Sequence, residues 1–138
     1  MKLVNKNIHY AIKALLYLAE RPQEVISARE LAFKLKIHRP FLRKILQFLG
    51  RHRMLKSRKG KGGGFALNVR PHKLRIMDLM NIFQVDTNII NCIFGKEVCQ
   101  QADNCLLRKR LKSIEDNLRK EFNTITIAAL LKGMHKRA

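Results

Sequence analysis

The sequence predicts a mainly α protein, a winged helix-turn-helix with a two-stranded wing plus a long C-terminal dimerisation helix. Three observations lead to this fold class. Apolar residues recur at helical spacing in three segments before residue 53. Two short apolar segments flank the glycines of residues 60–64, and a near-heptad apolar stripe begins at residue 107. The 138 residues, of which 46% are hydrophobic, suffice for one packed domain with an appended helical segment.

The first two helices are defined by their ends. Residues 5–20 carry apolar side chains at helical spacing, and Pro22 ends this helix because proline lacks the amide hydrogen. Ser27 and Glu30 have the spacing of a capping box, in which the Ser27 hydroxyl accepts from the Glu30 amide and the Glu30 carboxylate reaches back. The helix that they open is expected to run to about residue 35.

A third helix completes a helix-turn-helix. Pro40 suits its first turn, where a missing N–H costs nothing, and its apolar residues extend it to about His52. Two short helices joined by about four residues are typical of DNA-binding proteins, whose second helix enters the major groove. The polar side of the third helix predicts DNA contacts from His38, Arg39, Arg43 and Lys44, with Gln47 and Arg51 further along the same side. The alternative is a solvated basic face without a ligand.

The glycine-rich segment predicts a wing. Met54-Leu55 and Phe65-Ala66-Leu67 are the two expected strands, and glycine lets the tip between them adopt positive φ. A phosphate-binding loop of an enzyme requires Lys-Ser/Thr after its glycines and then a helix, and the sequence has neither. The cations of this segment are therefore expected to meet DNA phosphates or to enter the minor groove; they are Arg58, Lys59 and Lys61.

Positive charge is concentrated in the first half of the chain. The net charge is +19; residues 1–75 carry 19 Lys/Arg against 3 Asp/Glu, a net +16, and residues 76–138 carry 10 against 7, a net +3. This excess indicates a nucleic-acid partner, with an anionic membrane surface as the rival. No run of about 18 apolar residues predicts a membrane span. Lys13 interrupts the apolar stretch at the N-terminus, so we do not expect a signal peptide. We expect a cytoplasmic protein.

The C-terminal part is expected to hold a cysteine loop and a dimer seam. A fourth short helix near residues 76–83 contributes to the core, and residues 85–104 are irregular. A long helix then carries an apolar stripe at a spacing close to the coiled-coil heptad, followed by a last short helix. The stripe is expected to pair two subunits and consists of Leu107, Leu111, Ile114, Leu118 and Phe122. The predicted domains are residues 1–84, 85–105 and 106–138.

Three cysteines with the spacing C-x6-C-x5-C are candidate metal ligands: Cys92, Cys99 and Cys105. An odd number argues against a disulfide framework. Three thiolates suit an iron–sulfur cluster with one iron bound by another group, or zinc with a fourth ligand. By spacing alone, an iron–sulfur cluster, a zinc site and inert or redox-active thiols are equally well supported. A redox enzyme would leave the basic wing unexplained, and no catalytic constellation is recognisable, so an enzyme is not expected.

Several stretches together resemble a known family over essentially the whole length. They are "MKLVNKNIHYAIKALLYLA", "SARELAFKLKIHRPFLRKILQFLGRHRMLKS", "RKGKGGGFAL", the cysteine triplet and "NTITIAALL". The chain is similar to the winged-helix bacterial repressors that include the iron–sulfur cluster assembly regulator and the nitric-oxide-sensing repressor. The resemblance implies a homodimer on double-stranded DNA with a palindromic operator. It also implies that Cys92, Cys99 and Cys105 hold an iron–sulfur cluster that sets DNA affinity.

Two features depart from the family pattern. The first cysteine gap is six residues, where five is more usual. The relative with a two-iron cluster has a histidine soon after the third cysteine, whereas Leu106, Leu107 and Arg108 stand here, so a 4Fe-4S cluster is favoured over 2Fe-2S. Some relatives supply the fourth ligand from the partner's N-terminal helix, which makes His9 the first candidate. Asp103 and Glu97 are local alternatives, and an ordinary surface role for His9 is the competing interpretation.

Overall fold

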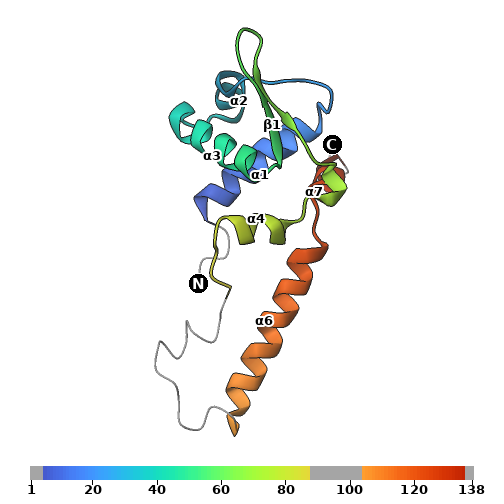
Figure 1. Cartoon of the computed structure of the whole chain (residues 1–138). Coiled ribbons are helices and arrows are strands. Elements are labelled where there is room, and N and C mark those ends of the chain that lie inside the picture. Colours follow the sequence, from blue (N-terminus) through green and yellow to red (C-terminus); the bar gives the residue numbers. More distant parts are fainter. Residues whose placement is uncertain (1–4, 88–103, 136–138) are drawn as a thin grey trace.

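The computed structural model describes residues 5–87 and 104–135. Its elements are the helices α1 (Lys6–Ala19), α2 (Ala28–Leu35), α3 (Arg39–Arg51), α4 (Ile76–Ile82), α6 (Leu106–Thr124) and α7 (Ile127–His135), the strands β1 (Leu55–Arg58) and β2 (Gly64–Leu67), and the 3-10 turn η1 (Pro71–Lys73). Helices α1 to α4 and α7 form one body with the β-hairpin at one end, and α6 extends from the other end (Figure 1). This arrangement confirms the predicted mainly α, winged helix-turn-helix class.

Local hydrogen bonds define the helix-turn-helix. The Ser27 hydroxyl accepts from the Glu30 amide at 3.1 Å and thereby caps α2. The return bond from the Glu30 carboxylate, which a full capping box requires, is not formed between these two described residues. Helix α2 ends at Leu35, and its C-cap residue Lys36 has a left-handed φ of 56°. The Ile37 amide donates to the Ala32 carbonyl at 3.0 Å. The turn before α3 is therefore Lys36–His38, close to the expected length.

The wing is an antiparallel pair in which Leu55 faces Leu67 and Arg58 faces Gly64. Strand β1 continues past the apolar residues that predicted it, because ladder pairing includes the polar residues up to Arg58. The tip is correspondingly short: it turns at Gly60, whose φ of 90° suits glycine, and the Gly63 amide donates to the Gly60 carbonyl at 3.0 Å.

A single residue of the α1–α2 connection extends this sheet. The Ile26 amide donates to the Phe65 carbonyl at 2.9 Å, and the Phe65 amide donates to the Ile26 carbonyl at 2.7 Å. A Cβ on the neighbouring Gly64 would lie 2.3 Å from the Ile26 carbonyl oxygen, which no side chain tolerates. Gly64 thus permits the two backbones to approach, and the bridge fixes the base of the wing to the body.

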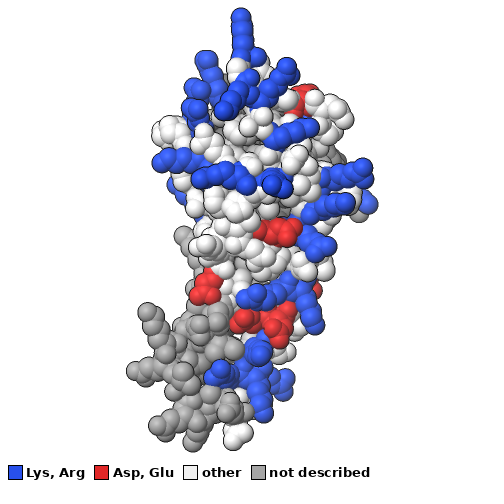
Figure 2. Space-filling model, viewed as in Figure 1, with Lys and Arg blue, Asp and Glu red and all other residues white. Residues whose placement is uncertain are grey.

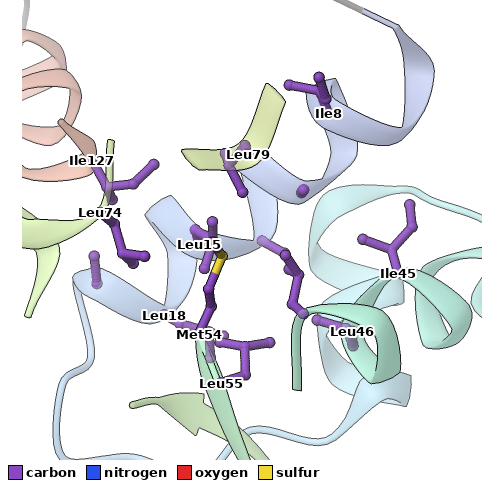
Figure 3. Packing of buried hydrophobic residues seen from close by; sticks show 14 of the residues in the cluster. Ile8, Leu15, Leu18, Ile45, Leu46, Met54, Leu55, Leu74, Leu79 and Ile127 are labelled. Carbon is purple, nitrogen blue, oxygen red and sulfur yellow. The ribbon is translucent and has the colours of Figure 1, made fainter. Parts of the chain in front are cut away.

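The hydrophobic core joins elements from both ends of the chain. Leu15 of α1, Leu46 of α3, Leu79 of α4 and Ile127 of α7 are all fully buried (Figure 3). Backbone bonds hold the start of α7 in place: the Ile127 amide donates to the Leu74 carbonyl at 2.8 Å. Helix α7 packs on α1 and η1, so the last described helix is part of the body that carries the wing.

Helix α6 packs on α4 near the body and extends away from it (Figure 1). Phe122 is partly buried against the main core. Leu111 is also buried, whereas Leu107 and Ile114 are each 53% exposed. The apolar stripe is therefore covered at some positions and open at others within a single chain. Among the described helices, none is both long and apolar enough to cross a membrane.

Candidate nucleic-acid interface

Helix α3 buries one face and presents the other to solvent. Its buried face consists of Leu42, Ile45, Leu46 and Leu49. The predicted contact residues lie on the exposed side: His38 at the N-cap, then Arg39, Arg43 and Lys44. Because burial of the apolar stripe fixes the rotation of the helix, the core itself determines that these polar side chains point outward.

The wing presents its cations at the same end of the molecule. Arg58, Lys59 and Lys61 are all exposed. Arg58 belongs to the ladder of β1, whereas Lys59 and Lys61 lie in the tip. Figure 2, viewed as Figure 1, shows many Lys and Arg side chains gathered over the end that carries the wing, whereas most of the visible acidic side chains lie lower down.

These cations have no acidic partners among the described residues. The ion pairs found there are Arg21–Glu20 at 3.2 Å, Arg119–Glu115 at 3.6 Å and His135–Glu20 at 3.7 Å. None of them involves a residue of α3 or of the wing. Uncompensated positive charge raises the local concentration of a polyanion and speeds its association. The surface is therefore suited to the phosphates of nucleic acid.

An open groove separates α3 from β1, which the sequence did not predict. It is lined by Gln47, Gly50, Arg51, Leu55, Lys56 and Ser57. The sequence pattern places Gln47 and Arg51 on the polar side of the helix, but their neighbours across the groove come from the strand. The one sequence signal is Gly50, a glycine inside a helical pattern, which often has a packing or functional reason.

The candidate metal ligands are only partly described. Cys105 is a free, partly exposed thiol at the N-cap of α6. Cys92 and Cys99 lie outside the described residues, as do the alternatives Glu97 and Asp103. In residues 5–87 and 104–135, no group of three His, Cys, Asp or Glu side chains is placed to hold a metal ion.

His9 and Cys105 are not brought together within one chain. His9 is exposed on α1, with its ring 5.7 Å from the ring of Tyr10. Helix α1 lies in the body (Figure 1). The first turn of α6 lies at the opposite end, because the N-terminal end of α6 is the one far from the body. At 1.5 Å per residue, the 19 residues of α6 span about 28 Å.

Comparisons with known proteins identify the family. Residues 4–133 match the Rrf2 family, described as iron-dependent transcriptional regulators. A protein of Aquifex aeolicus strain VF5 that is named as an HTH-type transcriptional regulator is 30% identical over 131 residues, which cover 94% of this chain and 91% of that protein. The transcriptional regulator NsrR of Bacillus subtilis strain 168 is 30% identical over 110 residues, 78% of this chain and 75% of that protein.

A solved structure shows the same fold. CymR, the global cysteine regulator of B. subtilis, superposes with a TM-score of 0.74 at 18% identity, covering 96% of this chain and 98% of that one. The family match spans both the winged body and α6, and it fits the exposed cations of α3 and the wing. The chain therefore belongs to the Rrf2 family of transcriptional regulators, proteins that bind DNA rather than catalyse a reaction.

Proposed function

We propose that this regulator is a homodimeric repressor of a palindromic operator, and that an iron–sulfur cluster sets its affinity for DNA. The observation that carries the DNA-binding mode is the set of exposed cations on α3 and the wing, which have no ion-pair partner in the described chain. Helix α3 enters the major groove, where His38, Arg39, Arg43 and Lys44 read or clamp the duplex. Arg58, Lys59 and Lys61 anchor the wing at phosphates or in the minor groove.

Dimerisation through α6 is the second part of the proposal. Leu107 and Ile114 are more than half exposed although they are large and apolar, and they belong to one stripe with Leu111, Leu118 and Phe122. A second copy of α6 would remove the open positions from water. Two subunits would then place two α3 helices about 34–36 Å apart, one turn of DNA, which a palindrome matches. A dimer that occupies such a site blocks other proteins from it, and this would repress transcription.

The cysteines are the proposed cluster ligands. The family's description as iron-dependent supports iron, and the free, partly exposed thiol of Cys105 supports its availability as a ligand. Cys92 and Cys99 complete the thiolate set. Since Leu106, Leu107 and Arg108 follow Cys105, no histidine stands there, and a 4Fe-4S cluster is the favoured form. When bound, the cluster would supply a metal centre whose loss or oxidation can report iron, oxygen or nitric oxide.

The fourth ligand is proposed to come from the other subunit. The separation of α1 from the start of α6 within one chain supports this, because His9 could serve the site only of a partner whose α6 lies beside α1 (Figure 1). A histidine ligand would bind through a neutral ring nitrogen. Asp103 and Glu97 are the alternatives from the same chain.

A thiol- or zinc-based sensor on the same fold is the competing function. The structural likeness to the global cysteine regulator CymR keeps this alternative open. The visible absorption spectrum and the iron and sulfide contents of protein made without oxygen separate the two. Iron and sulfide in comparable amounts favour the cluster, whereas zinc without sulfide, or no metal, favours the alternative.

The decisive experiment measures operator binding at one salt concentration, since protein–DNA affinity depends steeply on salt. A duplex is selected by the protein from a random pool, and its dissociation constant is measured with the cluster bound and after its removal. A coupling of about 1–3 kcal/mol corresponds to a 5- to 150-fold change in affinity. Equal affinities of the two forms would leave the cysteines a structural role and remove the sensing function.

A further inference from the structure

The lining of the groove between α3 and β1 includes a glycine that packing within the chain does not require. Gly50 is the second-last residue of α3, and a glycine inside a helix is less favourable than alanine. The nearest atom to a Cβ built at Gly50 would be the Leu55 carbonyl oxygen at 3.9 Å, an ordinary van der Waals distance. Gly50 is also not among the residues with positive φ. Neither sterics nor backbone conformation therefore explains this glycine.

A lining residue without a side chain permits a close approach to the backbone from outside. Glycine is the usual choice where a ligand comes near the backbone. The opening lies between Gln47 and Arg51 on the helix side and Lys56 and Ser57 on the strand side. What approaches Gly50 must therefore pass between two surfaces that carry donors.

The walls of the groove favour an anion. Arg51 and Lys56 are exposed, one on each side, and neither forms an ion pair in the described chain. The Arg51 guanidinium lies 5.8 Å from the ring centroid of Phe48. The C-terminal end of α3 contributes roughly half a negative charge. Two full cations outweigh it, and Ser57 and Gln47 add neutral hydrogen-bond donors.

We propose that this groove seats the sugar–phosphate strand of duplex DNA that runs between the major groove occupied by α3 and the minor groove reached by the wing. The inference rests on the proposed DNA-binding mode and adds residues to it. A strand separating the two grooves must pass between the two elements that enter them. The groove lies between α3 and β1, and its phosphates would meet Arg51 and Lys56 while the backbone at Gly50 lets the strand come close.

This phosphate-binding groove, the seat, would position the protein on DNA without reading its base sequence. Contacts to phosphates fix register and orientation, whereas contacts to base edges specify the sequence. Loss of the seat should therefore weaken binding to all duplexes by a similar factor. The preference for the selected operator over a scrambled duplex should stay unchanged.

The first test uses Gly50→Ala in the full chain. A methyl group at this position of the lining should reduce DNA affinity by on the order of tenfold, the effect of losing one hydrogen bond to a charged group. The melting temperature should stay the same or rise, since alanine favours helix. Unfolding therefore cannot explain the weaker binding. A Gly50→Ala protein that binds both duplexes as tightly as wild type would overturn the seat.

The second test removes charge from both sides of the groove. In Arg51→Gln and Lys56→Gln, the slope of log affinity against log salt should fall by about 0.9 for each phosphate that the variant no longer neutralises. Lys132→Gln, which removes one exposed cation of α7, is the matched control and should change neither slope nor affinity. A neutral methylphosphonate is then placed at one phosphate at a time along the duplex.

At least one methylphosphonate position should weaken wild-type binding but leave the Arg51→Gln/Lys56→Gln double variant unaffected, because the double variant has no cation to pair with that phosphate. If every position that weakens wild type weakens the double variant equally, the groove holds no phosphate and the inference fails. Failure of the proposed function has a different signature. Wild type would then bind no selected duplex better than a scrambled one, whatever the groove variants do.

Discussion

Phe48 of α3 and Phe83 at the C-cap of α4 are in contact, with their ring centroids 4.9 Å apart and their planes tilted by 35°. Since α4 also packs on α6, this aromatic pair connects the proposed dimer helix with the proposed recognition helix through only one intermediate element. A shift of α6 against the body would reach α3 through the packed side chains of α4 rather than through a flexible connection.

Phe83→Leu should reduce this mechanical connection. Leucine keeps an apolar side chain but removes the aromatic ring, so the stability loss should stay below about 1.5 kcal/mol. The ratio of operator affinities with and without the cluster should move towards one, while the affinity without the cluster stays near the wild-type value. Phe33→Leu is the control, because Phe33 is 79% exposed on α2. An unchanged ratio in Phe83→Leu would show that the coupling bypasses this pair.

Neutralising the wing should weaken binding without regard to sequence. Replacing Arg58, Lys59 and Lys61 with alanine should flatten the salt dependence by up to about 0.9 log unit for each phosphate that these side chains neutralise in the wild type. The measurement is a titration of fluorescent duplexes across several ionic strengths. A slope equal to that of wild type would remove the wing from the interface.

Ile114→Lys should split the dimer. Ile114 is 53% exposed in one chain, and the proposed seam would bury the new charge at a cost of several kcal/mol. Ser113→Lys places the same charge on the far side of α6, about 140° around the helix from the stripe, and should leave the dimer intact. Sedimentation velocity measures both, and a dimer that persists in Ile114→Lys contradicts the seam.

Substituting any of Cys92, Cys99 and Cys105 with alanine should lower the iron content and fix DNA affinity at the value of the cluster-free protein. Thiolates are the anionic ligands that hold such clusters, so two of them retain iron poorly. His9→Ala should loosen the cluster only if that side chain is the fourth ligand. Full iron and sulfide contents in all three cysteine variants would be incompatible with this ligand set.

Gly64→Ala should destabilise the wing. The new Cβ would lie 2.3 Å from the Ile26 carbonyl oxygen, so the two backbones must separate and break the bonds of 2.9 and 2.7 Å between Ile26 and Phe65. At about 0.5–1.5 kcal/mol for each bond, the free energy of unfolding should fall by roughly 1–3 kcal/mol. Thermal denaturation measures the destabilisation, and amide exchange at Ile26 locates it. Wild-type protection of that amide would be contrary to this account.

The elements that sequence reasoning placed correctly are those with local signals. Helical periodicity located α1 to α4, and glycines located the hairpin. Ser27 marked the start of α2 because its hydrogen bond to the Glu30 amide spans only three residues. The end of β1 was placed too early, since the strand continues through polar residues that pair across the ladder.

Interactions between distant segments escaped prediction. The bridge from Ile26 to Phe65 involves one residue of a connection, which leaves no periodic pattern. Nor does spacing reveal that Leu74 accepts a hydrogen bond from Ile127, because both are ordinary apolar residues. The exposed cations of α3 followed from the pattern, but the groove beside them depends on how β1 lies against the helix. Sites formed by two packed elements need the tertiary structure.

The packing of α7 on α1 has a consequence for the newly made chain. The ribosome releases α1 to α4 first, yet their core lacks Ile127 until roughly 50 further residues are made. At roughly 5–20 residues per second, that delay is about 3 to 10 seconds. During this time apolar surface of α1 stays open to chaperones or to other nascent chains. The body that carries α3 and the wing is therefore fully packed only after α7 has emerged and docked on α1.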